Sequence, residues 1–124
     1  MGRILAAMAL AVMLIGLAPA QANTYLENHF KCTLNEGKTR ADLIAFRAEY
    51  AAAVEASGLA DYSLAVMFPI YAGDIHPGGF TWIGRLGDFE NLQKISTWFR
   101  ATEWPAKFQH LMSCEESALL QVVD

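Results

Sequence analysis

Residues 61–86, DYSLAVMFPIYAGDIHPGGFTWIGRL, contain two extended segments joined by a glycine-rich loop. In the segment 61–71, apolar side chains occupy both alternating faces, a pattern that predicts a strand covered on both sides. Pro69 cannot donate a backbone hydrogen bond, so the far end of this strand should lie at an edge or a bulge. The loop 72–79 then turns the chain into the aromatic segment 80–86, which predicts the next strand.

A helical pattern precedes these two strands. Thr39, with Asp42 three residues later, forms a start that resembles a capping box. The apolar residues that recur at helical spacing after it are Leu43, Phe46, Tyr50 and Val54. Ser57-Gly58 predicts a left-handed cap, so this helix should end there.

A second helical pattern follows the strands. Asp88 is its predicted cap, and Glu90 should pair with Lys94 on the outer face. The predicted buried stripe consists of Phe89, Leu92, Ile95 and Phe99. Trp104-Pro105 should end this helix, and a short helix over 105–112 is expected next because proline suits a first helical position.

Two outer segments complete the pattern. Residues 29–34 alternate and predict a first strand, residues 35–38 supply a turn, and residues 118–122 predict a last strand. The order is therefore β-α-β-β-α-β, which predicts an α+β fold with an antiparallel sheet in the ferredoxin-like arrangement. In that arrangement the first and last strands are neighbours.

The chain has two cysteines, Cys32 and Cys114. In an oxidising compartment this count predicts one structural disulfide, and neighbouring first and last strands would let the two residues meet. The alternative, a redox-active pair, lacks the C-x-x-C spacing that tunes a thiolate.

The first 22 residues have the three parts of a secretory signal: basic Arg3, an apolar run over 4–18, and the small-residue end Ala20-Gln21-Ala22. We expect cleavage after Ala22 and a single domain over 23–124 in the periplasm or the medium. The alternative is an uncleaved anchor, although the run is shorter than the roughly 20 apolar residues that cross a bilayer.

The net charge of the chain limits the kinds of partner that it is expected to bind. Arg3 is the only charged residue of the signal, so residues 23–124 keep 8 of the 9 basic residues against 13 acidic ones, a net charge of −5. That charge repels phosphate backbones and anionic lipid, and the basic residues are scattered. We therefore expect no nucleic-acid partner and no membrane association after cleavage.

The element order, the aromatic strand 80–84 and the segments 32–34 and 37–39 together resemble the dimeric α+β barrel superfamily across nearly the whole mature chain. The resemblance implies a homodimer of ferredoxin-like domains that pair sheet to sheet. The superfamily includes cofactor-independent monooxygenases, haem-degrading monooxygenases, relatives of dye-decolourising peroxidases and proteins of no known activity, and the fold does not choose among them. Most cytoplasmic members lack a signal and a disulfide.

The strand with two apolar faces fits such a dimer, because one face would pack under the helices and the other would line a shared interior. The alternative is a monomer whose sheet is covered by the short helix 105–112.

Asp74 and His76 lie in the long loop, where a histidine near a carboxylate can act as a general base or as a metal or haem ligand. The alternative is an exposed histidine beside a turn-forming aspartate. Asn28 and His29 open the first strand and could point into an interior cavity, or they could form a solvated strand end. Trp82 could wall a ligand cavity, although such an aromatic is more often core.

The sequence gives little support for a metal site, a hydrolase or a nucleotide-dependent enzyme. The histidines, at positions 29, 76 and 110, lack local metal-ligand spacing, so no metal site is predicted. The sequence has no G-x-S-x-G motif and no phosphate-binding glycine loop, which disfavours hydrolases and nucleotide-dependent enzymes.

Two hypotheses remain. The first is an exported, non-catalytic module without a cofactor that binds a small apolar ligand or a partner protein. The second is a small cofactor-independent monooxygenase-like or haem-handling enzyme that uses His29, His76 or Asn28 around an aromatic cavity lined by Trp82.

Overall fold

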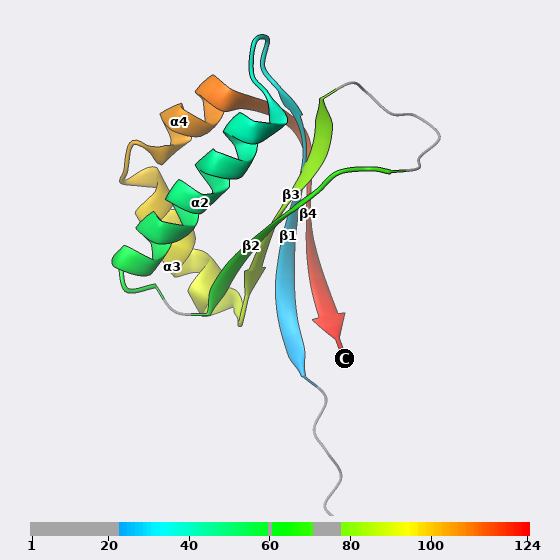
Figure 1. The fold of residues 1–124 in the computed structure, drawn as a ribbon. Coiled ribbons are helices and arrows are strands. Elements are labelled where there is room, and N and C mark those ends of the chain that lie inside the picture. The colour runs from blue at the N-terminus through cyan, green and yellow to red at the C-terminus, as the bar shows by residue number, and fades with distance from the viewer. Residues whose placement is uncertain (1–22, 60, 71–77) are drawn as a thin grey trace, which may run out of the picture.

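The computed structural model describes residues 23–59, 61–70 and 78–124. It contains four strands and three helices in these residues (Figure 1), in the order β1 (Thr24–Leu34), α2 (Arg40–Ala56), β2 (Tyr62–Met67), β3 (Gly79–Leu86), α3 (Phe89–Arg100), α4 (Trp104–Leu111) and β4 (Met112–Val123). The predicted α+β class with an antiparallel sheet is confirmed.

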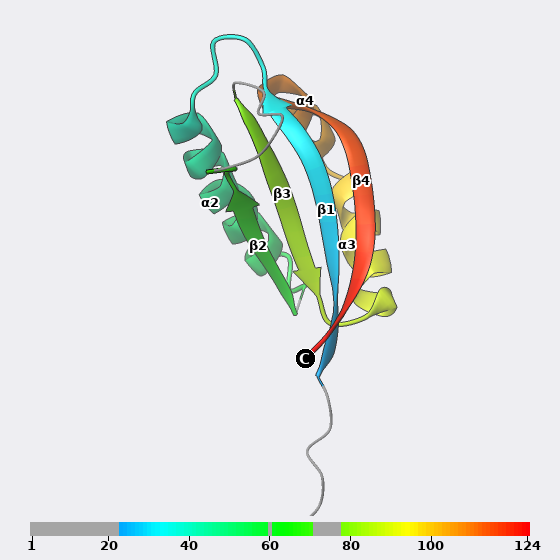
Figure 2. The same cartoon turned by 90° about the vertical axis from the view of Figure 1, so that its right-hand side faces the viewer.

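The strands form one open sheet in the order β2-β3-β1-β4, and every neighbouring pair is antiparallel. The three helices cover one face of this sheet, and the opposite face is turned to the viewer in Figure 2. We call these the helix face and the open face. Because side chains alternate along a strand, each strand contributes to both.

The first helix begins and ends as the sequence predicts. Thr39 and Asp42 form a capping box, in which the Thr39 hydroxyl accepts from the Asp42 amide at 3.2 Å and Asp42 accepts from the Thr39 amide at 2.8 Å. After the cap at Ser57, Gly58 adopts a φ of +79°, a left-handed conformation that glycine reaches without a Cβ clash.

The second helix matches its prediction only in part. Asp88 caps it, Lys94 pairs with Glu90 at 3.2 Å, and Ile95 is buried. The predicted burial of Phe89 is wrong, because this first helical residue is 66% exposed and lies outside the core cluster. The helix also ends at Arg100, four residues before the predicted stop, and α4 begins at Trp104.

The strand boundaries also differ from the predicted ones. The segment predicted as 61–71 is a strand only to Met67, two residues before Pro69. β1 begins at Thr24 and β4 at Met112, five and six residues before the predicted starts. The two strands pair with each other along their whole length. The backbone hydrogen bonds of this pairing keep residues in the strands even where polar side chains interrupt the alternating pattern.

Aromatic side chains dominate the core between the helices and the sheet. Tyr50 of α2 packs edge to face against Trp104 and Phe108 of α4, with ring centroids 5.1 and 5.0 Å apart. Trp82 of β3 lies 5.0 Å from Phe108 and is 4% exposed. Aromatic pairs prefer this geometry, and they join both helices to the centre of the sheet.

A disulfide joins Cys32 of β1 to Cys114 of β4, as predicted. The two residues face each other in the strand register, 82 positions apart in the sequence, with Cα atoms 4.0 Å apart. The register shifts between Lys31 and Cys32, so the bridge lies beside a bulge. It fastens the edge strand to the central one.

Among the described residues, the open face carries both buried and exposed side chains, since Ile83 in the centre of β3 is 2% exposed. Met67 is 52% exposed and Ser63 is also exposed on β2, where the sequence predicts cover on both sides. The helices cover only one face of β2. On the open face, Leu120 of β4 is also exposed, at 44%.

Candidate functional site

A cavity of about 370 Å³ lies on the helix face, between the sheet and the helices α3 and α4. Its lining comes from all four strands and all three helices of the described residues. The lining residues are Asn28, Phe30, Tyr50, Tyr62, Trp82, Gly84, Leu86, Leu92, Ile95, Ser96, Phe99, Arg100, Pro105, Phe108, Met112 and Cys114. Most of these side chains are aromatic or aliphatic, so the cavity is suited to apolar matter.

The absence of a side chain at Gly84 shapes the floor of the cavity. Gly84 lies in the middle of the sheet, opposite Asn28 of β1 and Leu64 of β2. The ring of Tyr62 packs across it, so that a Cβ on residue 84 would lie 3.0 Å from the Tyr62 hydroxyl oxygen and 3.2 Å from a ring carbon. A Cβ on residue 84 would therefore make an unusually tight contact, which Tyr62 could relieve only by moving.

Tyr50 and Tyr62 form a pair of buried phenols in the cavity wall, with ring centroids 6.4 Å apart. Burial raises the pKa of Tyr50 to about 12, and burial together with Tyr50 raises the pKa of Tyr62 still further. The two hydroxyls also affect each other, since Tyr62 lowers the pKa of Tyr50 and Tyr50 raises that of Tyr62. Both hydroxyls therefore stay protonated at neutral pH.

The other polar groups of the cavity come from β1 and α3. Asn28 contributes an amide from β1, and Ser96 and Arg100 lie four residues apart on α3, which places them on one face of the helix. The lining includes no aspartate, glutamate or histidine. The cavity therefore offers neutral hydrogen-bonding groups and one cation.

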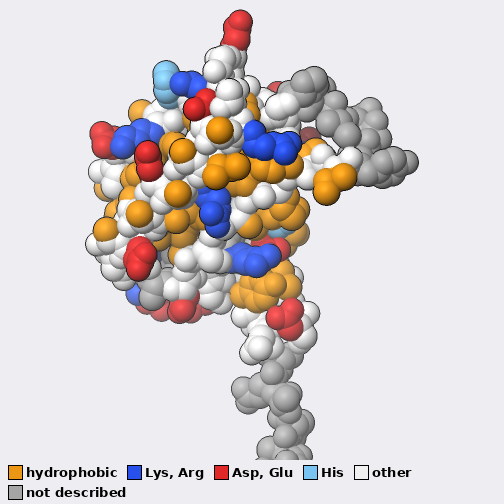
Figure 3. All heavy atoms as spheres, in the orientation of Figure 1, with side chains coloured by type: hydrophobic (Ala, Val, Ile, Leu, Met, Phe, Trp, Pro, Cys, Tyr) orange, Lys and Arg blue, Asp and Glu red, His pale blue; other side chains and the backbone are white. Residues whose placement is uncertain are grey.

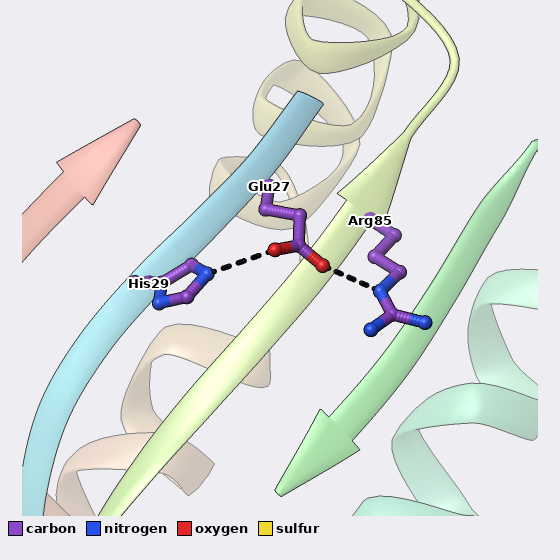
Figure 4. A network of polar contacts seen from close by, with 3 residues as sticks. All are labelled: Glu27, His29 and Arg85. Carbon is purple, nitrogen blue, oxygen red and sulfur yellow. Dashed lines mark hydrogen bonds and ion pairs between the residues drawn. The ribbon is translucent and has the colours of Figure 1, made fainter. Parts of the chain in front are cut away.

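A second polar cluster lies on the open face, on the other side of the sheet. Figure 4 shows Glu27 between His29 and Arg85, with one carboxylate oxygen 3.2 Å from His29 Nε2 and the other 2.6 Å from Arg85 Nε. The Glu27 side chain is 14% exposed. The hydrogen bonds from Arg85 and His29, in that order, hold the pKa of Glu27 below its ordinary value.

The structure brings together two of the residues that the sequence suggested. Asn28 and Trp82 both line the cavity. His29 is next to Asn28 in β1, but its side chain lies on the open face, because successive side chains of a strand point to opposite sides. Asp74 and His76 lie outside the described residues.

His110 lies away from both clusters. It is exposed near the end of α4, where its Nε2 atom is 3.2 Å from Lys38 Nζ. In the described ranges, no group of three or more histidine, cysteine, aspartate or glutamate side chains is arranged to hold a metal ion.

Sequence reasoning did not identify four of the polar lining residues, Tyr50, Tyr62, Ser96 and Arg100. For Ser96 and Arg100 a signal was present, because their spacing adds two polar residues beside the apolar stripe of α3. For the two tyrosines no local signal exists, because their pairing depends on how α2 packs against β2.

The molecular surface shows no broad charged region on the face drawn in Figure 3, where basic, acidic and hydrophobic side chains are intermingled. Over the part of the chain that the structure describes, no helix has the length and apolar character needed to cross a membrane. Comparisons with protein-family models, with curated proteins and with solved structures gave no match.

Proposed function

We propose that this protein binds a small apolar molecule in the cavity between its sheet and its helices, without catalysing a reaction. The observation that carries this proposal is the cavity of about 370 Å³ with aromatic walls and a few polar groups. Binding sites for small molecules have this size and composition, with polar groups that fix the orientation of the ligand.

The chemistry of the lining supports binding over catalysis. A general base needs a pKa near the working pH, and the cavity offers only the two phenols with raised pKa values, an amide, a hydroxyl and a guanidinium. The Glu27 and His29 pair lies on the opposite face of the sheet and does not line this cavity.

One observation favours the second candidate, a monooxygenase-like enzyme without a metal. Asn28 and Trp82 share the cavity, so an aromatic substrate could stack on Trp82 while the Asn28 amide holds one of its polar groups. Such an enzyme would depend on Asn28 rather than on His29. Turnover of the bound molecule in air, lost in Asn28→Ala, would replace the binding proposal with this one.

The proposed architecture is the ferredoxin-like one, in its dimeric α+β barrel form. From the β4 edge the strand order is β4-β1-β3-β2, and each helical connection joins two parallel strands that have an antiparallel strand between them. These connections support the proposed split βαβ arrangement. The exposed apolar side chains of Met67 and Leu120 on the open face support a second copy as its cover.

The proposed location is outside the cytoplasm, after removal of residues 1–22. The disulfide between Cys32 and Cys114 supports this location, since disulfides persist in oxidising compartments. The expected mature protein therefore begins at Asn23.

The binding proposal is tested with 2-naphthol, a neutral aromatic probe with one hydroxyl, titrated into the protein by isothermal calorimetry. Ser96→Phe should fill the cavity from α3 and abolish the binding heat. Thr97→Phe is the matched control, because Thr97 is exposed on the same helix and does not line the cavity. It should bind the probe as the unchanged protein does.

Circular dichroism and urea unfolding of both variants establish that they are folded. The absence of saturable 2-naphthol binding to the unchanged protein would refute the proposal. Equal binding by Ser96→Phe and Thr97→Phe would place the probe elsewhere and would refute it as well.

A further inference from the structure

We infer that the ligand of the cavity carries an anionic group, of the carboxylate type, and that Arg100 is the residue that selects it. The inference rests on the binding function proposed above and adds the chemical class of the ligand. It follows from the charges around the cavity, from the pairing of the neighbouring basic residues and from the position of Ser96.

The charge of the cavity lining is positive only. Among the sixteen side chains and backbone positions that surround the cavity, Arg100 is the one ionised group, and no carboxylate balances it. A ligand with an ammonium group would meet a like charge and no counter-ion. A ligand with a carboxylate would meet a guanidinium, whose planar donors match a carboxylate in a two-point contact.

Arg100 differs from Lys94 and Lys107 in having no acidic partner among the described residues. Lys94 pairs with Glu90, and Lys107 pairs with Glu103, each four residues apart and at 3.2 Å. The residues four positions from Arg100 are Ser96 and Trp104, neither of which is acidic. Within residues 23–59, 61–70 and 78–124, Arg100 makes no side-chain hydrogen bond or ion pair.

A neutral donor lies next to this free cation. Ser96 is one helical turn before Arg100 on the same face of α3, and both line the cavity. A carboxylate at this end could accept from the guanidinium and from the serine hydroxyl together. Its apolar part would then extend toward Phe108 and Trp82, away from solvent.

Arg100 could instead have a purely structural role. It is the last residue of α3, where a positive charge interacts favourably with the helix dipole. That role would stabilise the helix without any effect on which ligand binds. Ligand selectivity therefore separates the two roles, and stability alone does not.

The experiment compares two probes of the same shape, 2-naphthoate and the neutral 2-naphthamide, by calorimetric titration at pH 7. The unchanged protein should bind 2-naphthoate about tenfold more tightly, the ratio expected for one charge-assisted contact at a partly exposed site. Arg100→Gln should remove this preference, so that the two probes bind to the variant with nearly equal affinity.

Lys94→Gln is the control, because it removes one positive charge from the same helix without touching the cavity lining. It should keep the preference, which would exclude a general effect of net charge. If both probes bind equally to the unchanged protein, or if Arg100→Gln keeps the preference, the inference is wrong while the binding function stands. If neither probe binds, the proposed function itself fails.

Discussion

The phenol ring of Tyr62 lies directly across Gly84, with its hydroxyl oxygen 3.0 Å from where a Cβ on residue 84 would be. This contact joins the start of β2 to the centre of β3 and forms the floor of the cavity. The space left by one missing side chain thus determines where a buried hydroxyl is placed.

Gly84→Ala should therefore destabilise the protein by about 1–3 kcal/mol, the usual cost of forcing extra volume into a packed core. Urea unfolding measures this change in the free energy of unfolding. The same substitution made in a Tyr62→Leu background should cost clearly less, because the colliding ring is gone. Equal costs in the two backgrounds would show that the collision is not the cause.

Removal of the disulfide should destabilise the folded protein strongly, because the bond joins a central strand to an edge strand across a sequence separation of 82 residues. We expect the Cys32→Ala, Cys114→Ala double variant to lose about 4 kcal/mol in its free energy of unfolding. A reductant should lower the urea midpoint of the unchanged protein and leave that of the double variant unaffected. A loss below about 1 kcal/mol would contradict the stabilising role.

Acid should destabilise the protein partly through Glu27. Its pKa is lowered from the ordinary value of 4.5 by the hydrogen bonds from Arg85 and His29. The folded state therefore favours the carboxylate, and this stabilisation is present above pH 4.5 and is lost as the pH falls through the lowered folded-state pKa. Asp42, whose pKa is lowered by Thr39, acts in the same direction.

In Glu27→Gln, the free energy of unfolding should thus fall less steeply below pH 4.5 than in the unchanged protein, as measured by urea midpoints at a series of pH values. Glu116→Gln is the control, since its pair with Lys31 lies on the same face but is highly exposed. It should leave the pH dependence almost unchanged. The account of the cluster fails if both variants behave alike.

The open face should bind a second copy of the chain. Met67→Asp combined with Leu120→Asp places charges on its exposed apolar residues and should convert a dimer into a folded monomer in sedimentation experiments. Ile44→Asp, on the exposed side of α2, should remain dimeric and serves as the control. A monomeric unchanged protein at every concentration would contradict the dimer proposal.

Local signals predicted the framework of the fold well, because caps and periodicity act within a few residues. Such signals predict the cap of Thr39 with Asp42 and the cap at Asp88. The Cys32–Cys114 pair follows instead from the count of two cysteines and from the expected adjacency of the outer strands. The sequence pattern does not predict that β1 and β4 begin several residues earlier than their alternating segments. The ends of a strand depend on pairing with its neighbour, and local alternation does not encode that pairing.

The candidate site was predictable only in fragments. The sequence indicates Asn28 and Trp82, but it also suggests that adjacent Asn28 and His29 share one cavity, whereas a strand places their side chains on opposite faces. The cavity itself depends on the space left at Gly84 and on the packing of Tyr50 against Tyr62. These are tertiary relationships that no local pattern encodes.

The central claim, that a small apolar molecule occupies the cavity on the helix face, can be measured with two methyl groups. Met67 and Met112 are the two methionines of residues 23–124, and they report on opposite sides of the sheet. Met112 lines the cavity, and Met67 lies on the open face.

In protein labelled with ¹³C at the methionine methyl groups, saturating 2-naphthol should shift the Met112 resonance strongly, because an aromatic ring would enter its surroundings. The Met67 resonance should stay in place. A shift of Met67 without a shift of Met112 would put the probe on the open face, and no shift of either at saturation would contradict binding in the cavity.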